Sequence, residues 1–136
     1  MATAVLDAHA LLAFFRGEDA GVPVKDLLHK AATADRPLHM TEVNYAEVKY
    51  MLLKKDGIEA WEQAEDVLKS LPLEFHAATR ALADVAADFK ARFKMSLADA
   101  FAAALAKEKK AELVTGDPEF KEVEKEIKIN WLPKRE

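Results

Sequence analysis

Short apolar runs alternate with helical segments along almost the whole chain, and this order constrains the fold more than any other feature. The runs predict strands at 3–6, 38–41, 73–76, 112–115 and 127–132. Helical periodicity and alanine-rich stretches predict helices at 8–16, 22–34, 43–55, 58–70, 77–93 and 97–110, with a short helix from Pro118. Because parallel strands need crossover connections, this alternation predicts an α/β fold with three α/β/α layers around a mainly parallel, about five-stranded sheet.

Length and composition favour one domain that spans residues 1–136. A chain of 136 residues with 51% hydrophobic residues is large enough for a single packed core. It has no cysteine, which excludes disulfides and thiolate metal sites. The apolar start lacks a basic segment, and no run is long enough to span a bilayer. We therefore expect a soluble, cytoplasmic protein with no membrane partner.

The formal net charge of -4 argues against a protein that holds nucleic acid by an overall positive field. Any nucleic acid has to be bound locally. Clustered basic side chains are weak candidates for phosphate contacts, and solvated helix faces are their commoner role. These clusters are Lys49, Lys54 and Lys55; Lys90, Arg92 and Lys94; and Lys107, Lys109 and Lys110.

Four acidic residues share a placement near helix starts, in VLDAHALL, TEVNYAEV, SLADAF and LVTGDPEF. They are Asp7, Glu47, Asp99 and Asp117. Two of them, Asp7 and Asp117, follow predicted strands, and the carboxyl ends of parallel strands are where ligands bind in open α/β sheets. Gathered carboxylates repel one another unless a cation joins them, and oxygen ligands suit Mg²⁺ or Mn²⁺. Such ions drive displacement at phosphorus, so the leading hypothesis is a metal-dependent nuclease.

Each of these acids also has a purely structural interpretation. Asp7 and Asp117 have the form of N-caps, the latter followed by Pro118 at the first helical position. Ser96 and Asp99 fit a capping-box-like pattern, and Glu47 is expected near the positive end of a helix dipole. For one acid alone the capping interpretation is favoured, but four together with two at strand ends favour a site.

Other polar residues near these positions are less informative. The hydroxyl of Thr115, two residues before Asp117, is suited to hold a water or a phosphate oxygen, although a β-branched strand residue is equally expected there. Glu42 competes with Glu47 for the second acidic position. His9 receives no role, and the remaining histidines show no ligand spacing to it or to one another; these are His29, His39 and His76.

The segments VLDAHALLAFF, NYAEVKYML, SLADAFAAALA and LVTGDPEF, in this order, resemble PIN-domain ribonucleases, especially the VapC-type toxins of toxin–antitoxin pairs. The resemblance covers nearly the whole chain. It implies a PIN-like fold and a magnesium-dependent endoribonuclease that hydrolyses RNA with a metal-activated water. The acids that it implies as metal ligands are Asp7, Glu47, Asp99 and Asp117, with Thr115 as the accompanying hydroxyl.

The resemblance also implies a small antitoxin partner and a homodimer. That Asp99 joins the other acids rests on the resemblance alone, because Asp99 begins a helix that follows another helix. His9 departs from the family pattern, which usually has a small polar residue two places after the first acid.

One alternative stays open from the sequence, and the motifs disfavour two others. The open one is a catalytically silent PIN-like module that binds RNA or protein, with the acids acting only as caps. A receiver-type phosphoacceptor requires adjacent acids and a late lysine, for which Lys134 is the candidate, but Asp7 stands alone. A phosphohydrolase of the haloacid dehalogenase type requires DxD, which Asp7-Ala8-His9 does not supply.

Overall fold

The protein is seen in a computed structural model that describes residues 3–133. Its centre is a sheet in the order β3-β2-β1-β4-β5, and every pairing is parallel. The strands are β1 (Ala4–Leu6), β2 (Leu38–Thr41), β3 (Leu73–His76), β4 (Glu112–Thr115) and β5 (Ile129–Trp131). The predicted α/β class is confirmed, and the sheet is wholly parallel.

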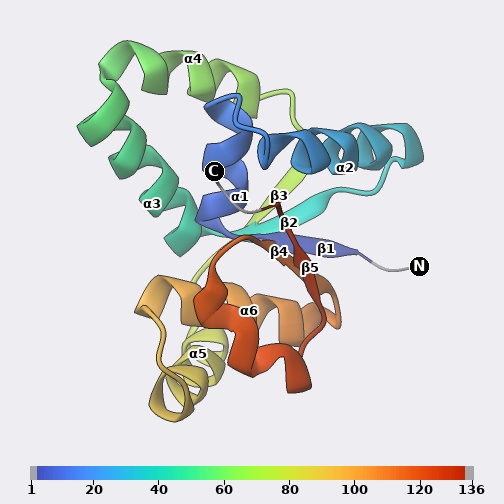
Figure 1. Ribbon diagram of the computed structural model, residues 1–136, viewed down its shortest axis with the longest axis vertical. Helices are drawn as coiled ribbons and strands as arrows, with labels where there is room; N and C mark the ends of the chain where they lie inside the picture. The colour runs from blue at the N-terminus through green and yellow to red at the C-terminus, as the bar shows by residue number, and fades with distance from the viewer. Residues whose placement is uncertain (1–2, 134–136) are drawn as a thin grey trace.

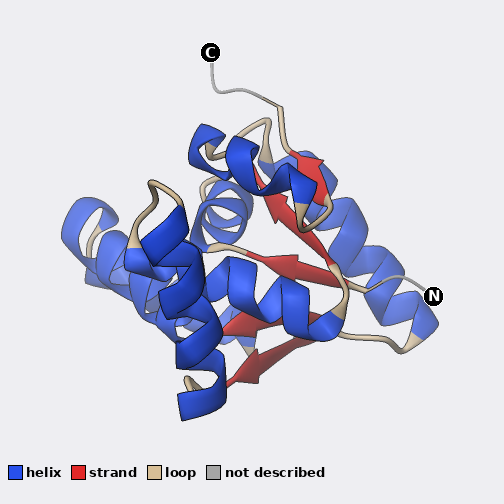
Figure 2. Ribbon diagram, turned by 90° about the horizontal axis from the view of Figure 1, so that it is seen from below, coloured by secondary structure: helices blue, strands red, loops and turns tan. Residues whose placement is uncertain are grey.

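Helices cover both faces of the sheet, which gives the predicted three layers (Figures 1 and 2). One face carries α1 (Ala8–Phe15), α2 (Gly21–Ala34), α3 (Glu42–Met51), the π-helical turn η1 (Leu52–Asp56) and α4 (Ile58–Leu68). The other carries α5 (Arg80–Arg92), α6 (Leu97–Lys109) and the 3₁₀ helix η2 (Pro118–Lys125).

Side chains that alternate along the central strands divide the interior into two apolar cores. Leu6 and Val114 pack with α1 to α4, whereas Val5 and Leu113 pack with α5 and α6. All four side chains are fully buried. Strands that are apolar on both faces are expected in a parallel sheet covered on both sides.

Three of the differences between predicted and observed boundaries have a clear local cause. Helix α5 begins at Arg80 and not at residue 77, because the Thr79 hydroxyl accepts the Leu82 N–H and ends the preceding extended segment. Strand β5 is shorter than predicted, since the N–H of Ile127 bonds back to Val123 at the end of η2. The predicted helix 43–55 is α3 followed by the wider turn of η1, which ends at Gly57 with φ 97°.

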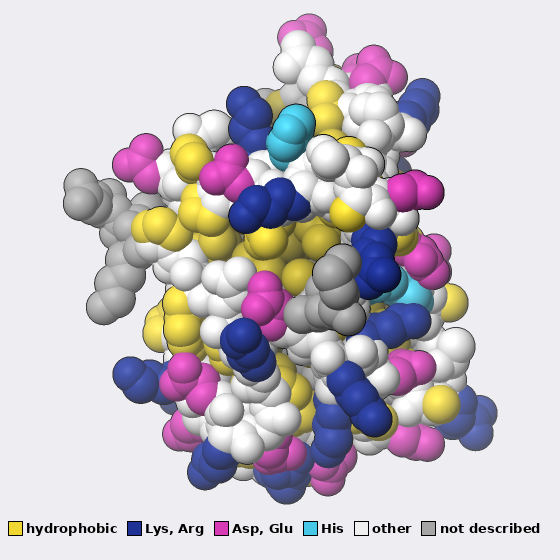
Figure 3. Space-filling model, turned by 90° about the vertical axis from the view of Figure 1, so that its right-hand side faces the viewer, with side chains coloured by type: hydrophobic (Ala, Val, Ile, Leu, Met, Phe, Trp, Pro, Cys, Tyr) yellow, Lys and Arg dark blue, Asp and Glu magenta, His cyan; other side chains and the backbone are white. Residues whose placement is uncertain are grey.

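The two ends of the sheet differ in chemistry. Figure 3 shows the end where the strands begin, with hydrophobic side chains in a hollow among charged ones. A pocket of about 230 Å³ lies at this end, lined by Thr3, Leu27, Ala31, Leu38 and Glu112 among others. The carboxyl ends of the strands lie on the opposite side of the molecule, and the acids follow them there.

Lys134, the lysine weighed for a receiver domain, lies outside the described residues. None of the helices within residues 3–133 has the length and apolar character needed to cross a membrane.

Candidate metal centre

Asp7 ends β1 and caps α1 from a buried position. Its side chain is 1% exposed, and its Oδ1 accepts the Ala10 N–H at 2.8 Å. The other oxygen, Oδ2, accepts the Thr115 hydroxyl at 2.5 Å. The carboxylate is therefore fixed between the first turn of α1 and the end of the neighbouring strand β4.

Thr115 connects two of the acids through one hydroxyl group. Its Oγ1 donates to Asp7 and accepts the backbone N–H of Asp117 at 3.0 Å. Asp117 in turn caps η2, because its Oδ1 accepts the Glu119 N–H at 2.9 Å. The register of β1 with β4, which pairs Leu6 with Val114, brings these segments together.

Glu47 reaches the same region from α3 and is positioned by Asn44. Thr41 caps α3, and its hydroxyl donates to Asn44 Oδ1 at 2.5 Å while it accepts the Asn44 N–H at 3.0 Å. The Asn44 side-chain amide, which is fully buried, then lies 3.5 Å from Glu47 Oε1. Glu42 is exposed in the first turn of α3 and does not line this region, so α3 contributes Glu47.

Asp99 enters from α6, on the opposite face of the sheet from α3. Ser96 caps α6 by accepting the Asp99 N–H at 3.1 Å, and the Asp99 side chain is 9% exposed. The Asn44 amide also donates to the Ala98 carbonyl at 3.1 Å. This contact between α3 and α6 explains how an acid at a helix-to-helix junction meets acids that follow strands, which strand-end geometry could not predict.

The four acids line one open pocket of about 330 Å³. Its lining residues are Asp7, Ala8, His9, Leu12, Ala13, Arg16, Glu18, Glu47, Met51, Lys55, Ser96, Asp99, Asp117 and Glu119. Glu119 was missed by the sequence reasoning, although it stands in the quoted GDPEF segment. Carboxylate oxygens of Asp99, Asp117 and Glu119 lie within 4.8 Å of one another.

The pKa values show that the acids oppose each other's ionisation. Burial, followed by the nearby charges of Asp99 and Asp117, raises the pKa of Asp7 to about 7 against the hydrogen bonds that lower it. Burial and then the Asp117 charge raise the pKa of Asp99 to about 7. The pKa of Glu47 is also raised, chiefly by burial and also by the Asp117 charge. A cation among these groups would favour their ionised forms.

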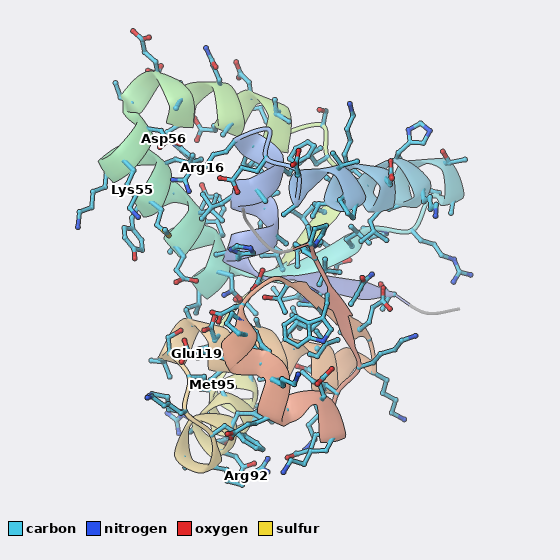
Figure 4. The ribbon with its side chains drawn as sticks, in the orientation of Figure 1. Arg16, Lys55, Asp56, Arg92, Met95 and Glu119 are labelled. Carbon is cyan, nitrogen blue, oxygen red and sulfur yellow. The ribbon has the colours of Figure 1, made fainter. Side chains whose placement is uncertain are left out.

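Basic side chains lie at the rim of the pocket rather than between the acids. Within residues 3–133, no ion pair joins a lysine or arginine to any of the four predicted acids. Arg16 and Lys55 line the pocket, and Arg16 pairs with Asp56 at 2.9 Å. Figure 4 shows these three residues together on the α1 and η1 side, with Glu119 on the η2 side.

The other basic clusters proposed from the sequence are engaged elsewhere. Lys49 lies over the Trp61 ring at 5.2 Å. Arg92 pairs with Asp88 at 2.9 Å and contacts Glu126, which Lys107 approaches to 3.9 Å. These clusters therefore behave as helix surfaces, and Lys55 is the member that lines the acidic pocket.

A second pocket adjoins the first through His9. It has a volume of about 580 Å³ and is lined by His9, Gly116, Pro118, Lys121, Trp131, Leu132 and Pro133. The His9 ring packs so closely on Gly116 that a Cβ there would lie 2.6 Å from His9 Nε2. His9 thus separates an acidic pocket from one that offers a half-exposed indole and a lysine.

The donor set fits a hard divalent cation. It consists of carboxylate oxygens only, with no competing ion pair among the described residues, and oxygen-only sites select Mg²⁺ or Mn²⁺ over softer metals. Capping accounts for Asp7 and Asp117, whose side chains accept helix N–H groups. It does not account for Glu47 or Asp99, because Thr41 and Ser96 cap those helices.

The chain belongs to the PIN domain family, whose model matches residues 4–126. The family resemblance stated from the sequence is thereby confirmed. A comparison with curated proteins returns no match.

Solved structures share the fold at low sequence identity. VapBC2 from Rickettsia felis, bound to a DNA fragment from its promoter, superposes with a TM-score of 0.74 at 18% identity, covering 96% of this chain and 99% of that one. DNA-bound VapBC from Salmonella typhimurium gives 0.68 at 17%, covering 96% and 98%. Mycobacterium tuberculosis VapC20, described as a sarcin-ricin loop cleaving toxin, gives 0.62 at 19%, covering 82% and 87%.

Proposed function

We propose that this PIN-domain protein is a Mg²⁺- or Mn²⁺-dependent endoribonuclease and the toxin component of a VapBC-type pair. One observation carries the proposal: four carboxylates from four separate segments share a pocket, in which burial and the neighbouring acids raise the pKa values of Asp7, Glu47 and Asp99. Helix capping alone requires no such convergence. The similar structures support the same reaction, since one of them is described as an RNA-cleaving toxin.

In this proposal the chain's residues hold the ion and orient the substrate. Asp7, Glu47, Asp99 and Asp117 would hold the metal, which when bound would supply an activated water and neutralise charge at the phosphorus. Thr115 holds Asp7 and the Asp117 backbone in register. Lys55, which lines the pocket, would supply positive charge for an incoming phosphate, whereas the Arg16 guanidinium already pairs with Asp56.

The partners follow from the similar structures and from one surface. VapBC complexes are among the matches, so we propose a small antitoxin that binds this chain and a homodimeric assembly. Apolar side chains remain exposed along α3, η1 and α4, which supports a partner surface there. These are Tyr50, Leu53, Ile58 and Val67, with exposed fractions of 53%, 36%, 59% and 40%.

RNA cleavage tests the catalytic proposal. The purified chain should cleave structured RNA with Mg²⁺ or Mn²⁺ and stop when EDTA is added. Asp7→Asn should abolish most of this activity and keep the fold, because asparagine caps a helix as well as aspartate does. Cleavage that survives EDTA would contradict the metal mechanism.

Growth of a host cell tests the toxin proposal separately. Expression of this chain alone should slow growth, and coexpression of a small protein encoded beside it should restore growth. Asp7→Asn should be harmless when expressed at the same level. A chain that cleaves RNA in vitro and leaves growth unchanged would instead be a housekeeping nuclease.

The silent-module alternative retains one specific observation, which is that Asp7 and Asp117 do act as caps. It predicts RNA or protein binding that is insensitive to Mg²⁺. Titration of the purified chain with Mg²⁺ by calorimetry separates the two functions, because a module whose acids serve only as caps gives no saturable heat.

A further inference from the structure

A second group of metal-ligating side chains comes from the edge strand β3 and its neighbour β2, and none of its members lines the acidic pocket. His39 from β2 and Glu74 and His76 from β3 place one ligand atom each within 4.8 Å of the other two. The prediction that His39 and His76 have no ligand spacing was wrong, because parallel pairing of β2 with β3 brings positions 37 residues apart into contact.

The geometry of this group is close to that of a metal site. His39 Nδ1 lies 2.8 Å from His76 Nε2, and His76 Nε2 lies 3.8 Å from Glu74 Oε1. Ligands on a tetrahedral Zn²⁺ at about 2.1 Å are separated by roughly 3.4 Å, so the two observed distances bracket the required one. Shifts of about half an ångström in side chains at an edge strand would complete the arrangement.

The surroundings also suit a metal that binds imidazole. His39 and His76 are partly buried, whereas Glu74 is exposed and leaves the site open to solvent. The N–H between the two rings would move to an outward ring nitrogen and leave both facing nitrogens free to bind.

We propose that His39, Glu74 and His76 form a site for a divalent transition-metal ion of the Zn²⁺ class. Two imidazoles and one carboxylate with an open fourth position suit Zn²⁺, Ni²⁺ or Cu²⁺ and not Mg²⁺. The bound ion would join the edge strand β3 to β2, whose last residue caps α3. The site shares no residue with the acidic pocket.

Zn²⁺ binding to the metal-stripped full chain tests this proposal. Asp99→Asn serves as the background, because it weakens metal binding in the acidic pocket. In that background we expect one bound Zn²⁺ per chain, measured by competition with a chromophoric chelator. Adding His39→Gln or His76→Gln should weaken binding at least roughly tenfold, the lower end of what loss of a metal ligand's hydrogen-bond partner costs. His29→Gln, which removes an exposed histidine, is the matched control.

Two further measurements keep the test decisive. Glu74→Gln changes an exposed side chain and should also weaken Zn²⁺ binding without loss of the fold. Zn²⁺ should raise the melting temperature of the Asp99→Asn chain and not that of Asp99→Asn with His76→Gln. Absence of Zn²⁺ binding in the background, or equal binding in all histidine variants, would overturn the proposal. Mg²⁺-dependent RNA cleavage by His39→Gln should be unchanged. Failure of the Zn²⁺ site can therefore be distinguished from failure of the proposed nuclease function.

Discussion

Asp7 and Asp99 are the two acids of the acidic pocket whose pKa values are raised most. Both have their pKa raised from 3.8 to about 7, with burial as the main cause. A folded state whose acids have raised pKa values binds more protons than the unfolded chain between pH 4 and 7. These two residues therefore favour folding at acid pH and oppose it once both ionise.

The sign of this linkage gives the first prediction. In EDTA, the contribution of Asp7 and Asp99 to the free energy of unfolding is fully present below about pH 4 and is lost as pH rises through about 7. Urea denaturation at several pH values between 5 and 8 should show this decline, and Asp99→Asn should reduce it. Mg²⁺ at pH 8 should restore the stability of the parent far more than that of the variant. An identical pH profile for both chains would contradict the prediction.

Asn44 gives the second prediction at this scale, because one buried amide joins three segments. It contacts the Thr41 hydroxyl, the Glu47 carboxylate and the Ala98 carbonyl. Asn44→Ala leaves these groups without that partner and should cost about 1–3 kcal/mol in urea denaturation. It should also lower Mg²⁺ affinity by roughly 10–100-fold, as loss of hydrogen bonds behind metal ligands does.

Glu42→Gln is the control for Asn44→Ala, since Glu42 is an exposed neighbour on the same helix. It should change neither quantity. A stability loss in Asn44→Ala with unchanged Mg²⁺ affinity would show that Asn44 supports the fold and does not position Glu47.

At the scale of elements, the end of β4 and the start of η2 form the most constrained part of the site. Thr115 is the last residue of β4, and its hydroxyl holds both Asp7 and the Asp117 backbone. Thr115→Val keeps the branched shape that suits the strand and removes the hydroxyl, whereas Thr115→Ser keeps the hydroxyl. Cleavage should fall roughly 10–100-fold in Thr115→Val and recover substantially in Thr115→Ser. Equal activity in the two variants would remove Thr115 from the site.

The sequence predicted elements well where local chemistry decides them. Strands β2, β3 and β4, of four residues each, were predicted with the observed bounds. A short apolar run between polar turns defines both ends of such a strand. The start of α5 was missed because Ala77 and Ala78 have high helix propensity, while the cap at Thr79 sets the boundary. Helix propensity does not reveal where the first turn is capped.

Contacts between segments that are distant along the chain could not be predicted from the sequence. The meeting of Asp99 with the strand-end acids depends on the α3 to α6 contact through Asn44, and no local pattern encodes it. His39 and His76 meet only because β2 and β3 are neighbours in register. Glu119 carried a local signal, since it follows Asp117 by two residues, but the capping interpretation of that segment did not require its side chain.

At the scale of the whole molecule, the net charge of -4 and the acidic pocket oppose the approach of RNA. In the proposed function, RNA must therefore be bound by local positive and aromatic groups around the pocket. The adjoining pocket supplies both, because Lys121 and Trp131 line it, and His9 lies between it and the acidic pocket. A nucleotide next to the cleaved bond would stack on Trp131 in the adjoining pocket. Lys55, which lines the acidic pocket, would contact the RNA backbone.

The dependence of RNA binding on salt tests this arrangement. Measured in an Asp7→Asn background that does not cleave, Lys121→Ala and Lys55→Ala should each weaken binding and reduce the slope of log K against log salt by about 1. Lys90→Ala, an exposed lysine on α5 away from both pockets, should leave the slope unchanged. Trp131→Ala should weaken binding with no change in slope, because stacking releases no counterions. If Lys90→Ala reduced the slope as much as Lys121→Ala, RNA would be held by diffuse charge and not by a path that leads to the acids.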